Sequence, residues 1–304
     1  MTEVSRFYET HDKRFRALIH PNARLQKLGG GFEWPEGPVW FPAFGMLLFS
    51  DIPAGRMMRW TEGAGCSVFR HDSDYANGNT RDPEGRLVTC HHGSRCLRRI
   101  EHDGQVTVLA SHHDGRRLNS PNDVVVRRDG SIWFTDPTYG ILSDLEGYRA
   151  EPEQSGSYVY RLPPGGGAPA AVVTDMTQPN GLCFSPDERL LYVAESGASH
   201  DETVPPAIRV YKVSEDGRTV ASGRDFAVID AGLPDGIRAD SAGNIWSSAA
   251  DGIHVFAPEG TLLGKILVPE IVSNLCFGGP RGNRLFITAA TSLYMIAVNA
   301  CAPK

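Results

Sequence analysis

The sequence predicts an all-β fold, a six-bladed β-propeller, and the main observation is a repeat. Units begin near residues 36, 77, 122, 180, 235 and 273, each opening on an oxygen-bearing side chain with a turn about eight residues later. Their spacing is close to the ~40–50 residues of a four-stranded propeller blade. The apolar runs within each unit are short and β-like, such as Met46–Ser50 and Ser131–Thr135. A β-sandwich with incidental internal similarity is the alternative.

A propeller must be closed, because an open sheet edge invites pairing with other chains. We expect a strand from about Ala23 to Leu28 to join the last blade beside the run Leu293 to Val298. The prediction is therefore a single propeller domain over residues 23–304, preceded by an extension over residues 1–22. Asp12 to Ile19 is the one stretch with a helical apolar pattern.

Composition narrows the class of protein and its partners. The chain has 30 basic and 36 acidic residues, a net charge of −6, and no long basic run, which argues against a nucleic-acid surface. No stretch approaches the ~18 apolar residues of a membrane span. The N-terminal residues lack the apolar core of a signal peptide, so we expect a cytoplasmic protein, or a periplasmic one if a precursor segment has been removed. The six cysteines show no metal-ligand spacing and are expected to be reduced and structural.

Two insertions lengthen the repeat, Pro137 to Gly156 and Ser196 to Pro206. Each falls between the second and third strands of its blade. Because the strands are antiparallel, both loops should cover the face on which the first strands begin. Long loops gathered on one face usually serve binding.

Propeller symmetry brings the first residue of every inner strand to one end of the central channel. The six positions that converge carry oxygen atoms and are Glu36, Asn77, Asn122, Asn180, Asp235 and Ser273. Oxygen ligands without Cys or His suit hard cations, Ca²⁺ above all. Glu36 and Asp235 would balance a divalent charge, and the amide oxygens of Asn122 and Asn180 would add neutral ligands, leaving positions open toward the loops for substrate or water. Taken singly, Asn and Asp are also common turn residues, but Glu36 is a poor turn former.

The chain resembles a known family in several segments. They are Trp34-Pro35-Glu36-Gly37-Pro38, Arg117-Leu118-Asn119-Ser120-Pro121-Asn122-Asp123-Val124, Trp133-Phe134-Thr135-Asp136-Pro137, Pro179-Asn180-Gly181-Leu182 and Pro234-Asp235-Gly236. These are similar to the signature segments of the gluconolactonase/regucalcin (senescence marker protein) family, and most of all to bacterial gluconolactonases. The resemblance runs from Glu33 to Val298 and implies a six-bladed propeller with a central divalent ion.

By this resemblance the metal ligands are Glu36, Asn122, Asn180 and Asp235, and the ion is Ca²⁺, with Zn²⁺, Mg²⁺ or Mn²⁺ as alternatives. The implied reaction is hydrolysis of a sugar lactone, such as D-glucono-1,5-lactone, to the aldonate. A bound cation would polarise the carbonyl, and Asp235 would act as the general base or position the water. Direct attack by Asp235 is the alternative.

Further contacts to the sugar are expected around the Asn122 loop. Asn122 itself, Arg117 and Asn119 are candidates for hydrogen bonds to hydroxyl groups, although Arg117 could equally be a solvated loop charge. His91 could assist proton transfer or hydrogen-bond in the channel rim. Asp136 could support the Asn122 loop or bind a second ion. Trp34, Tyr139 and Phe32 could wall the sugar or pack in the core.

Two other functions fit the same pattern. The related diisopropylfluorophosphatase resembles the family in its ligands, so a phosphotriesterase-like hydrolase is one rival. A non-catalytic calcium-binding propeller is the second. We expect a small-molecule lactone as the partner, with no nucleic acid and no membrane. The sequence leaves the oligomeric state open.

Overall fold

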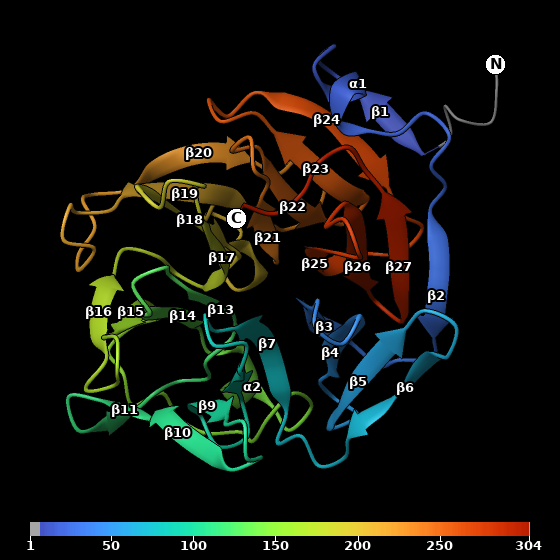
Figure 1. The fold of residues 1–304 in the computed structure, drawn as a ribbon. Helices are drawn as coiled ribbons and strands as arrows, with labels where there is room; N and C mark the ends of the chain where they lie inside the picture. Colours follow the sequence, from blue (N-terminus) through green and yellow to red (C-terminus); the bar gives the residue numbers. More distant parts are fainter. Residues whose placement is uncertain (1–6, 304) are drawn as a thin grey trace.

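The predicted six-bladed propeller is confirmed by a computed structural model that describes residues 7–303. Residues 1–6 of the expected N-terminal extension and residue 304 lie outside the described residues. Figure 1 looks along the central channel, around which the six sheets are arranged like the blades of a fan. Inner strands of neighbouring blades contact one another all the way around the ring.

Each blade is an antiparallel sheet whose first strand in sequence lies at the channel. The strands of blades 1 to 3, from the channel outward, are β3 (Pro35–Phe41), β4 (Met46–Asp51), β5 (Arg56–Thr61) and β6 (Gly65–Arg70); β7 (Ala76–Arg81), β8 (Leu87–His91), β9 (Cys96–Ile100) and β10 (Val106–Ala110); and β13 (Val124–Val126), β14 (Ile132–Asp136), β15 (Tyr158–Leu162) and β16 (Ala170–Val173).

Blades 4 to 6 repeat this order, and the last two recruit strands from the N-terminal segment. Their strands are β17 (Pro179–Phe184), β18 (Leu190–Glu195), β19 (Ala207–Lys212) and β20 (Arg224–Val228); β21 (Ile237–Ala239), β22 (Ile245–Ala249), β23 (Gly252–Phe256), β24 (Leu262–Leu267) and β1 (Tyr8–Thr10); and β25 (Val272–Gly278), β26 (Arg284–Ala289), β27 (Ser292–Ala297) and β2 (Gln26–Gly30).

The ring closes as expected, with a strand from before the first blade completing the sixth. β2 pairs antiparallel with β27, Gln26 opposite Met295 and Gly30 opposite Ser292. The strand lies about two residues later than the sequence suggested. This pairing removes the open edges at the point where the two ends of the chain meet.

The N-terminal segment also contributes structure before β2. β1 adds a fifth strand to blade 5 through its pairing with β24. The short helix α1 (Phe15–Leu18) follows and buries Phe15 completely against blades 5 and 6. The described part of the predicted extension is thus packed against the propeller.

The apolar core lies between the blades as six layers, one for each pair of neighbours. Because both faces of a blade are covered, its middle strands are apolar on consecutive residues rather than on alternate ones. Leu47, Leu48 and Phe49 of β4 are all buried. The six cysteines are all free, and four of them are buried.

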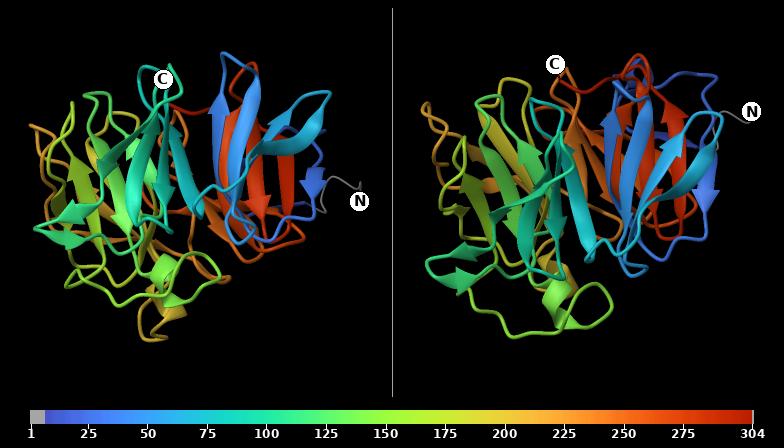
Figure 2. Two further views of the ribbon diagram at one scale, coloured as in Figure 1. Left: turned by 90° about the horizontal axis from the view of Figure 1, so that it is seen from below. Right: turned by 60° about the horizontal axis from the view of Figure 1, so that its bottom comes forward.

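Both insertions project from the same end of the ring (Figure 2). The first carries the short helix α2 (Tyr139–Leu142), and the second carries the 3₁₀ turn η2 (Gly197–Ser199). The C-terminus lies at the opposite end. A small hairpin, β11 (His112–His113) with β12 (Arg116–Arg117), lies outside the blades. Among residues 7–303, no helix is both long enough and apolar enough to cross a membrane.

Candidate metal centre and active site

The inner strands are irregular where the predicted ligands lie. Pairing between the first and second strands shifts register between Glu36 and Val39 in blade 1 and between Pro179 and Leu182 in blade 4. Equivalent irregularities occur in blades 2 and 6. Such bulges free backbone groups from the ladder and re-aim the adjacent side chains.

The freed backbone groups bond to the next blade instead. The Gly78 N–H donates to the Asn122 carbonyl oxygen at 2.8 Å, and the Gly181 N–H donates to the Asp235 carbonyl oxygen at 3.0 Å. A side chain at Gly181 would meet the backbone of blade 5, with its Cβ 2.8 Å from Gly236 Cα. The glycine after the ligand position therefore lets neighbouring inner strands approach closely enough for their ligands to converge.

Acceptors at the ends of the second strands hold the segments that lead into the ligands. Asp51 accepts hydrogen bonds from the backbone N–H groups of Glu33 and Trp34, just before Glu36. Glu195 does the same for the two residues before Pro179. Asp136 accepts from the Asn119 N–H at 2.8 Å, which gives it the supporting position before the Asn122 loop.

The ligand positions open onto a cavity of about 330 Å³ beneath the two insertions. Five of the six predicted positions line it, and the lining residues that carry polar side chains are Trp34, Glu36, Asn77, Asn122, Tyr139, Glu146, Asn180, Ser196, Ser199 and Asp235. The sixth position, Ser273, instead donates its hydroxyl to the Pro35 carbonyl oxygen at 2.6 Å and links blade 6 to blade 1.

Glu36 is fixed by two hydrogen bonds to one of its carboxylate oxygens. Oε2 accepts from the Gly37 N–H at 2.6 Å and from Asn274 Nδ2 at 2.8 Å. The other oxygen, Oε1, is buried and has no partner among the described residues. One oxygen is thus held by the protein while the second remains available to a ligand.

Asn77 is oriented by a histidine that the sequence did not single out. His92 Nδ1 donates to the Glu146 carbonyl oxygen at 2.9 Å, so in the neutral ring Nε2 accepts from Asn77 Nδ2 at 3.1 Å. Burial lowers the pKa of His92 to about 4, which keeps the ring neutral at pH 7. With its amide nitrogen engaged, Asn77 leaves Oδ1 buried and without a partner among the described residues.

The two carboxyl groups of the site, Glu36 and Asp235, have raised pKa values. Burial, with a smaller contribution from Asp123, raises the pKa of Glu36 to about 7. Burial and then the charge of Glu36 raise the pKa of Asp235 well above its usual range, despite a hydrogen bond from Asn180. Close negative charges in a poorly solvated site favour either protonation or a bound cation.

The formal charges along the channel axis indicate the charge of that cation. Glu36, Asp123 and Asp235 carry −3 when ionised, and Arg238, whose Nη1 lies 3.1 Å from Asp123 Oδ2, carries +1. Without Glu146, which enters the cavity from the first insertion, the sum is −2, the charge that one divalent ion would balance. Three buried oxygens without partners among the described residues, Glu36 Oε1, Asn77 Oδ1 and Asn180 Oδ1, offer hard ligands to it. The donor set therefore fits a cation such as Ca²⁺.

The first insertion brings in an acidic residue that the sequence reading missed. Glu146 lines the cavity, its charge acts on Asp235, and burial raises the pKa of Glu146. Tyr139 ties the two insertions together, because its hydroxyl donates to the Ser196 carbonyl oxygen and contacts Ser199 Oγ. Nothing in the repeat marks these residues, since they lie in a loop outside its period.

Several predicted substrate contacts lie elsewhere. The Arg117 guanidinium donates to the Ser94 carbonyl oxygen, and Asn119 is buried with its amide bonded to Asp136 and Gly156. His91 is buried and bonds the Ser73 carbonyl oxygen through Nδ1. None of the three is among the cavity-lining residues. Of the possible aromatic walls, Trp34 and Tyr139 line the cavity, whereas Phe32 packs in the core.

A second group of potential ligands consists of Asp251 and His254 in blade 5 and Asp230 in the loop that leads into it. Lys265 Nζ stands 2.6 Å from Asp230 Oδ1 and 3.0 Å from Asp251 Oδ2. The ammonium group already supplies the positive charge that these carboxylates attract. We therefore assign this cluster to ion pairing that fixes the loop before Asp235.

Comparison with known proteins agrees with this architecture. Residues 34–291 match the family described as SMP-30/gluconolactonase/LRE-like region. A gluconolactonase from Zymomonas mobilis is 34% identical, over 93% of this chain and 83% of the relative. A pentonolactonase from Haloferax volcanii is 29% identical, over 84% of this chain and 81% of the relative. A solved gluconolactonase from Xanthomonas campestris is 38% identical with a TM-score of 0.89, over 96% of this chain and 94% of that chain. The chain therefore belongs to the SMP-30/gluconolactonase family.

Proposed function

We propose that the cavity beneath the insertions hydrolyses a sugar lactone, such as D-glucono-1,5-lactone, to the aldonate with the help of bound Ca²⁺. The observation that carries the proposal is the ring of oxygen ligands at the channel end, with three buried oxygens that lack partners among the described residues. Similarity to a gluconolactonase and a pentonolactonase supports the lactone as the substrate class. The cavity volume of about 330 Å³ lies at the lower end of the ~300–1,000 Å³ typical of small-molecule sites.

The residues around the ion define its role. Glu36, Asn122, Asn180 and Asp235 would hold it, together with Asn77, which shares the cavity. When bound, a divalent cation polarises the lactone carbonyl and stabilises the negative charge that develops on its oxygen. The cavity side of the ligand ring is left to the substrate and to water.

Asp235 would take the proton of the attacking water, because a bound cation would keep its carboxylate ionised despite burial and the charge of Glu36. Its carboxylate lies on the cavity wall and is partly exposed there, whereas Glu36 is buried and engaged by Asn274. As the water oxygen bonds to the carbonyl carbon, one of its protons passes to Asp235. The ring C–O bond then breaks, and the ring oxygen receives a proton to become the hydroxyl group of the aldonate.

Glu146 is placed to supply that proton to the ring oxygen. It lines the cavity from the first insertion, and burial raises its pKa. An acid with a raised pKa holds its proton closer to neutral pH and is a better donor to a leaving oxygen. Asp235, at the channel end, would thus act as the base and Glu146, in the first insertion, as the acid.

The test is hydrolysis of glucono-1,5-lactone followed by pH-stat titration and corrected for spontaneous opening. Four samples are compared: the wild type, the wild type with chelator, the chelated sample with Ca²⁺ restored, and Asp235→Asn. Asp225→Asn is the matched control, since Asp225 is an exposed aspartate in the outer strand β20. The same samples are then assayed on a pentonolactone and on an organophosphate triester.

We expect activity to disappear with chelator, to return with Ca²⁺, and to be absent in Asp235→Asn while the control keeps the wild-type rate. Full activity in both the chelated sample and Asp235→Asn would exclude this site from lactone hydrolysis. Faster turnover of the triester than of either lactone would favour a phosphotriesterase-like hydrolase. Calcium binding without turnover of any substrate would favour a non-catalytic propeller.

A further inference from the structure

A second cavity, of about 490 Å³, occupies the opposite end of the central channel. All six inner strands contribute to it with their far ends, and the C-terminal residues Ala302 and Pro303 lie at its edge. The metal ligands lie at the beginnings of the same strands. The two cavities are therefore at opposite mouths of one channel, and this one faces away from the insertions.

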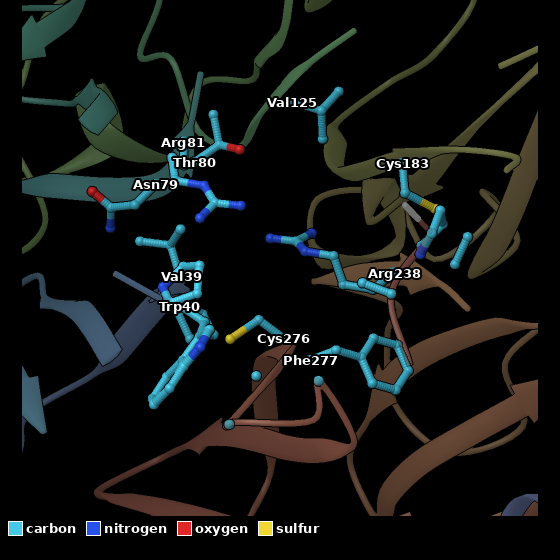
Figure 3. Close-up of a pocket in the computed structure, with 18 of the residues that line it drawn as sticks. Val39, Trp40, Asn79, Thr80, Arg81, Val125, Cys183, Arg238, Cys276 and Phe277 are labelled. Atoms are coloured by element: carbon cyan, nitrogen blue, oxygen red, sulfur yellow. The ribbon is translucent and has the colours of Figure 1, made fainter. Parts of the chain in front are cut away.

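Two guanidinium groups point into this cavity from different blades. Figure 3 shows the side chains of Arg81 and Arg238 directed toward the centre of the opening. Arg238 Nη1 donates hydrogen bonds to Asp123 Oδ2 at 3.1 Å and to the Ile237 carbonyl oxygen at 2.7 Å. Its remaining N–H groups bond no described residue, and Arg81 forms neither an ion pair nor a side-chain hydrogen bond within residues 7–303.

The charge of the lining contrasts with that of the whole molecule. The chain carries a net charge of −6, yet no Asp or Glu is among the described residues that line this cavity. Asp123, just behind the lining, neutralises one of the two guanidinium groups. Among the lining residues and Asp123, one positive charge is left in excess. The acidic residues Asp82, Glu84 and Glu188 line the adjoining cavity, which shares Arg81 and Arg238.

The rest of the lining is mainly apolar. Trp40 and Phe277 flank the opening with Val39 and Val125 (Figure 3). Trp40 is held rigidly, because its ring stacks on Phe286 at 5.4 Å between centroids. A few convergent polar groups in a mostly apolar concavity are the usual composition of a small-molecule site. The planar fork of Arg matches carboxylate and phosphate groups, to which it donates two hydrogen bonds.

We propose that this mouth of the channel binds a small anion, a carboxylate or phosphate compound, between Arg81 and Arg238. The anionic group lies between the two guanidinium groups, and its carbon skeleton packs against Trp40 and Phe277. Thr80, next to Arg81 in the lining, adds a hydroxyl donor. The site is separate from the lactone cavity and does not depend on the activity proposed for it.

The test is isothermal titration calorimetry of the full-length protein with two probes, inorganic phosphate and gluconate, each with and without chelator. Arg81→Gln is the informative variant, because Arg81 is exposed and bonds no described residue, so its loss should not disturb folding. Arg238 is left intact, since removing it would leave Asp123 buried without its ion-pair partner. Arg24→Gln is the matched control, because Arg24 is an exposed arginine outside the blades.

We expect saturable binding of at least one probe, with one site per chain and persisting in chelator. Loss of one charge-assisted bidentate contact should weaken it about tenfold in Arg81→Gln, and Arg24→Gln should bind like the wild type. Preference for phosphate or for gluconate identifies the anionic group. The proposal is overturned if neither probe binds, if Arg81→Gln binds as tightly as the wild type, or if chelator abolishes binding, which would move the anion to the metal site. Lactone hydrolysis by Arg81→Gln should stay at the wild-type rate.

Discussion

Replacing Glu36 by Gln should separate the metal-binding role of this side chain from its role in the fold. In Glu36→Gln, the amide oxygen can accept the hydrogen bonds from Gly37 and Asn274 that Oε2 now accepts. The amide nitrogen would replace Oε1, which has no partner among the described residues. The change therefore removes the proposed ligand oxygen and a negative charge while conserving volume.

The sign of the effect on stability depends on the ion. Without a cation, ionised Glu36 is costly, as the raised pKa of about 7 indicates, so the chelated variant should be at least as stable as the chelated wild type. With Ca²⁺ at about one hundred times its dissociation constant, the wild type gains about 2.7 kcal/mol from binding. At about 2.1 cal/mol/K of unfolding entropy per residue, this gain raises Tm by about 4 °C for a chain of 304 residues.

The assay is thermal unfolding of both proteins with chelator and with Ca²⁺. Glu270→Gln provides the control, because Glu270 accepts hydrogen bonds from Ser292 and Tyr294 in the closing blade and does not line the metal cavity. The control should lose stability equally with and without Ca²⁺ and keep the Ca²⁺-dependent shift. Glu36→Gln should lose the shift. If it keeps the full shift, or if it is as destabilised in chelator as in Ca²⁺, Glu36 is not a ligand.

Three further outcomes are expected. Burial raises the pKa of Glu270, but several hydrogen bonds together outweigh it and lower this pKa to about 2. The stabilisation from Glu270 is therefore complete above pH ~4.5 and is lost as the pH falls toward 2. Glu270→Gln should cost about 2 kcal/mol at pH 7 in chemical unfolding and should flatten this loss of stability in acid. Glu146→Gln should lower kcat for the lactone about 10²-fold, a usual contribution of general acid–base catalysis. Calorimetry should show unchanged Ca²⁺ binding. An unaltered kcat would exclude Glu146 as the acid. Gly181→Ala should weaken Ca²⁺ binding and lower the free energy of unfolding by about 1–3 kcal/mol, because the added Cβ would stand 2.9 Å from the Ile237 nitrogen. Wild-type affinity for Ca²⁺ would show that the blades can separate without moving the proposed ligands.

The fold could be predicted because the same sequence pattern recurs in every blade. Six copies of one pattern fix the number of blades, and the apolar run at Leu293 to Val298 locates the blade that needs a partner strand. β1 escaped prediction for a physical reason. Tyr8–Thr10 joins blade 5 through backbone hydrogen bonds to an outer edge, and its polar side chains leave no apolar period to detect.

The site divides in the same way between the repeat and its insertions. Glu36, Asn122, Asn180 and Asp235 lie in one cavity because each has the same phase in its blade. Glu146 and His92 do not occupy this repeated position in their blades. Glu146 reaches the cavity only through the path of a long loop, and His92 acts on Asn77 through a hydrogen bond that no spacing in the sequence encodes.

The channel is negatively charged at the end that faces the insertions and positively charged at the other end, and this polarity couples its two mouths. From the insertions inward come the carboxylates of Glu36 and Asp235, then Asp123 paired with Arg238, and then the cavity that Arg238 shares with Arg81. In this weakly solvated interior, a cation at one end and an anion at the other attract each other through the intervening groups. Reciprocity requires that each should tighten the binding of the other by the same factor. Phosphate titrations of Asp235→Asn and of the wild type, each with and without Ca²⁺, measure that factor. A dissociation constant for phosphate that Ca²⁺ raises in the wild type would contradict this electrostatic order.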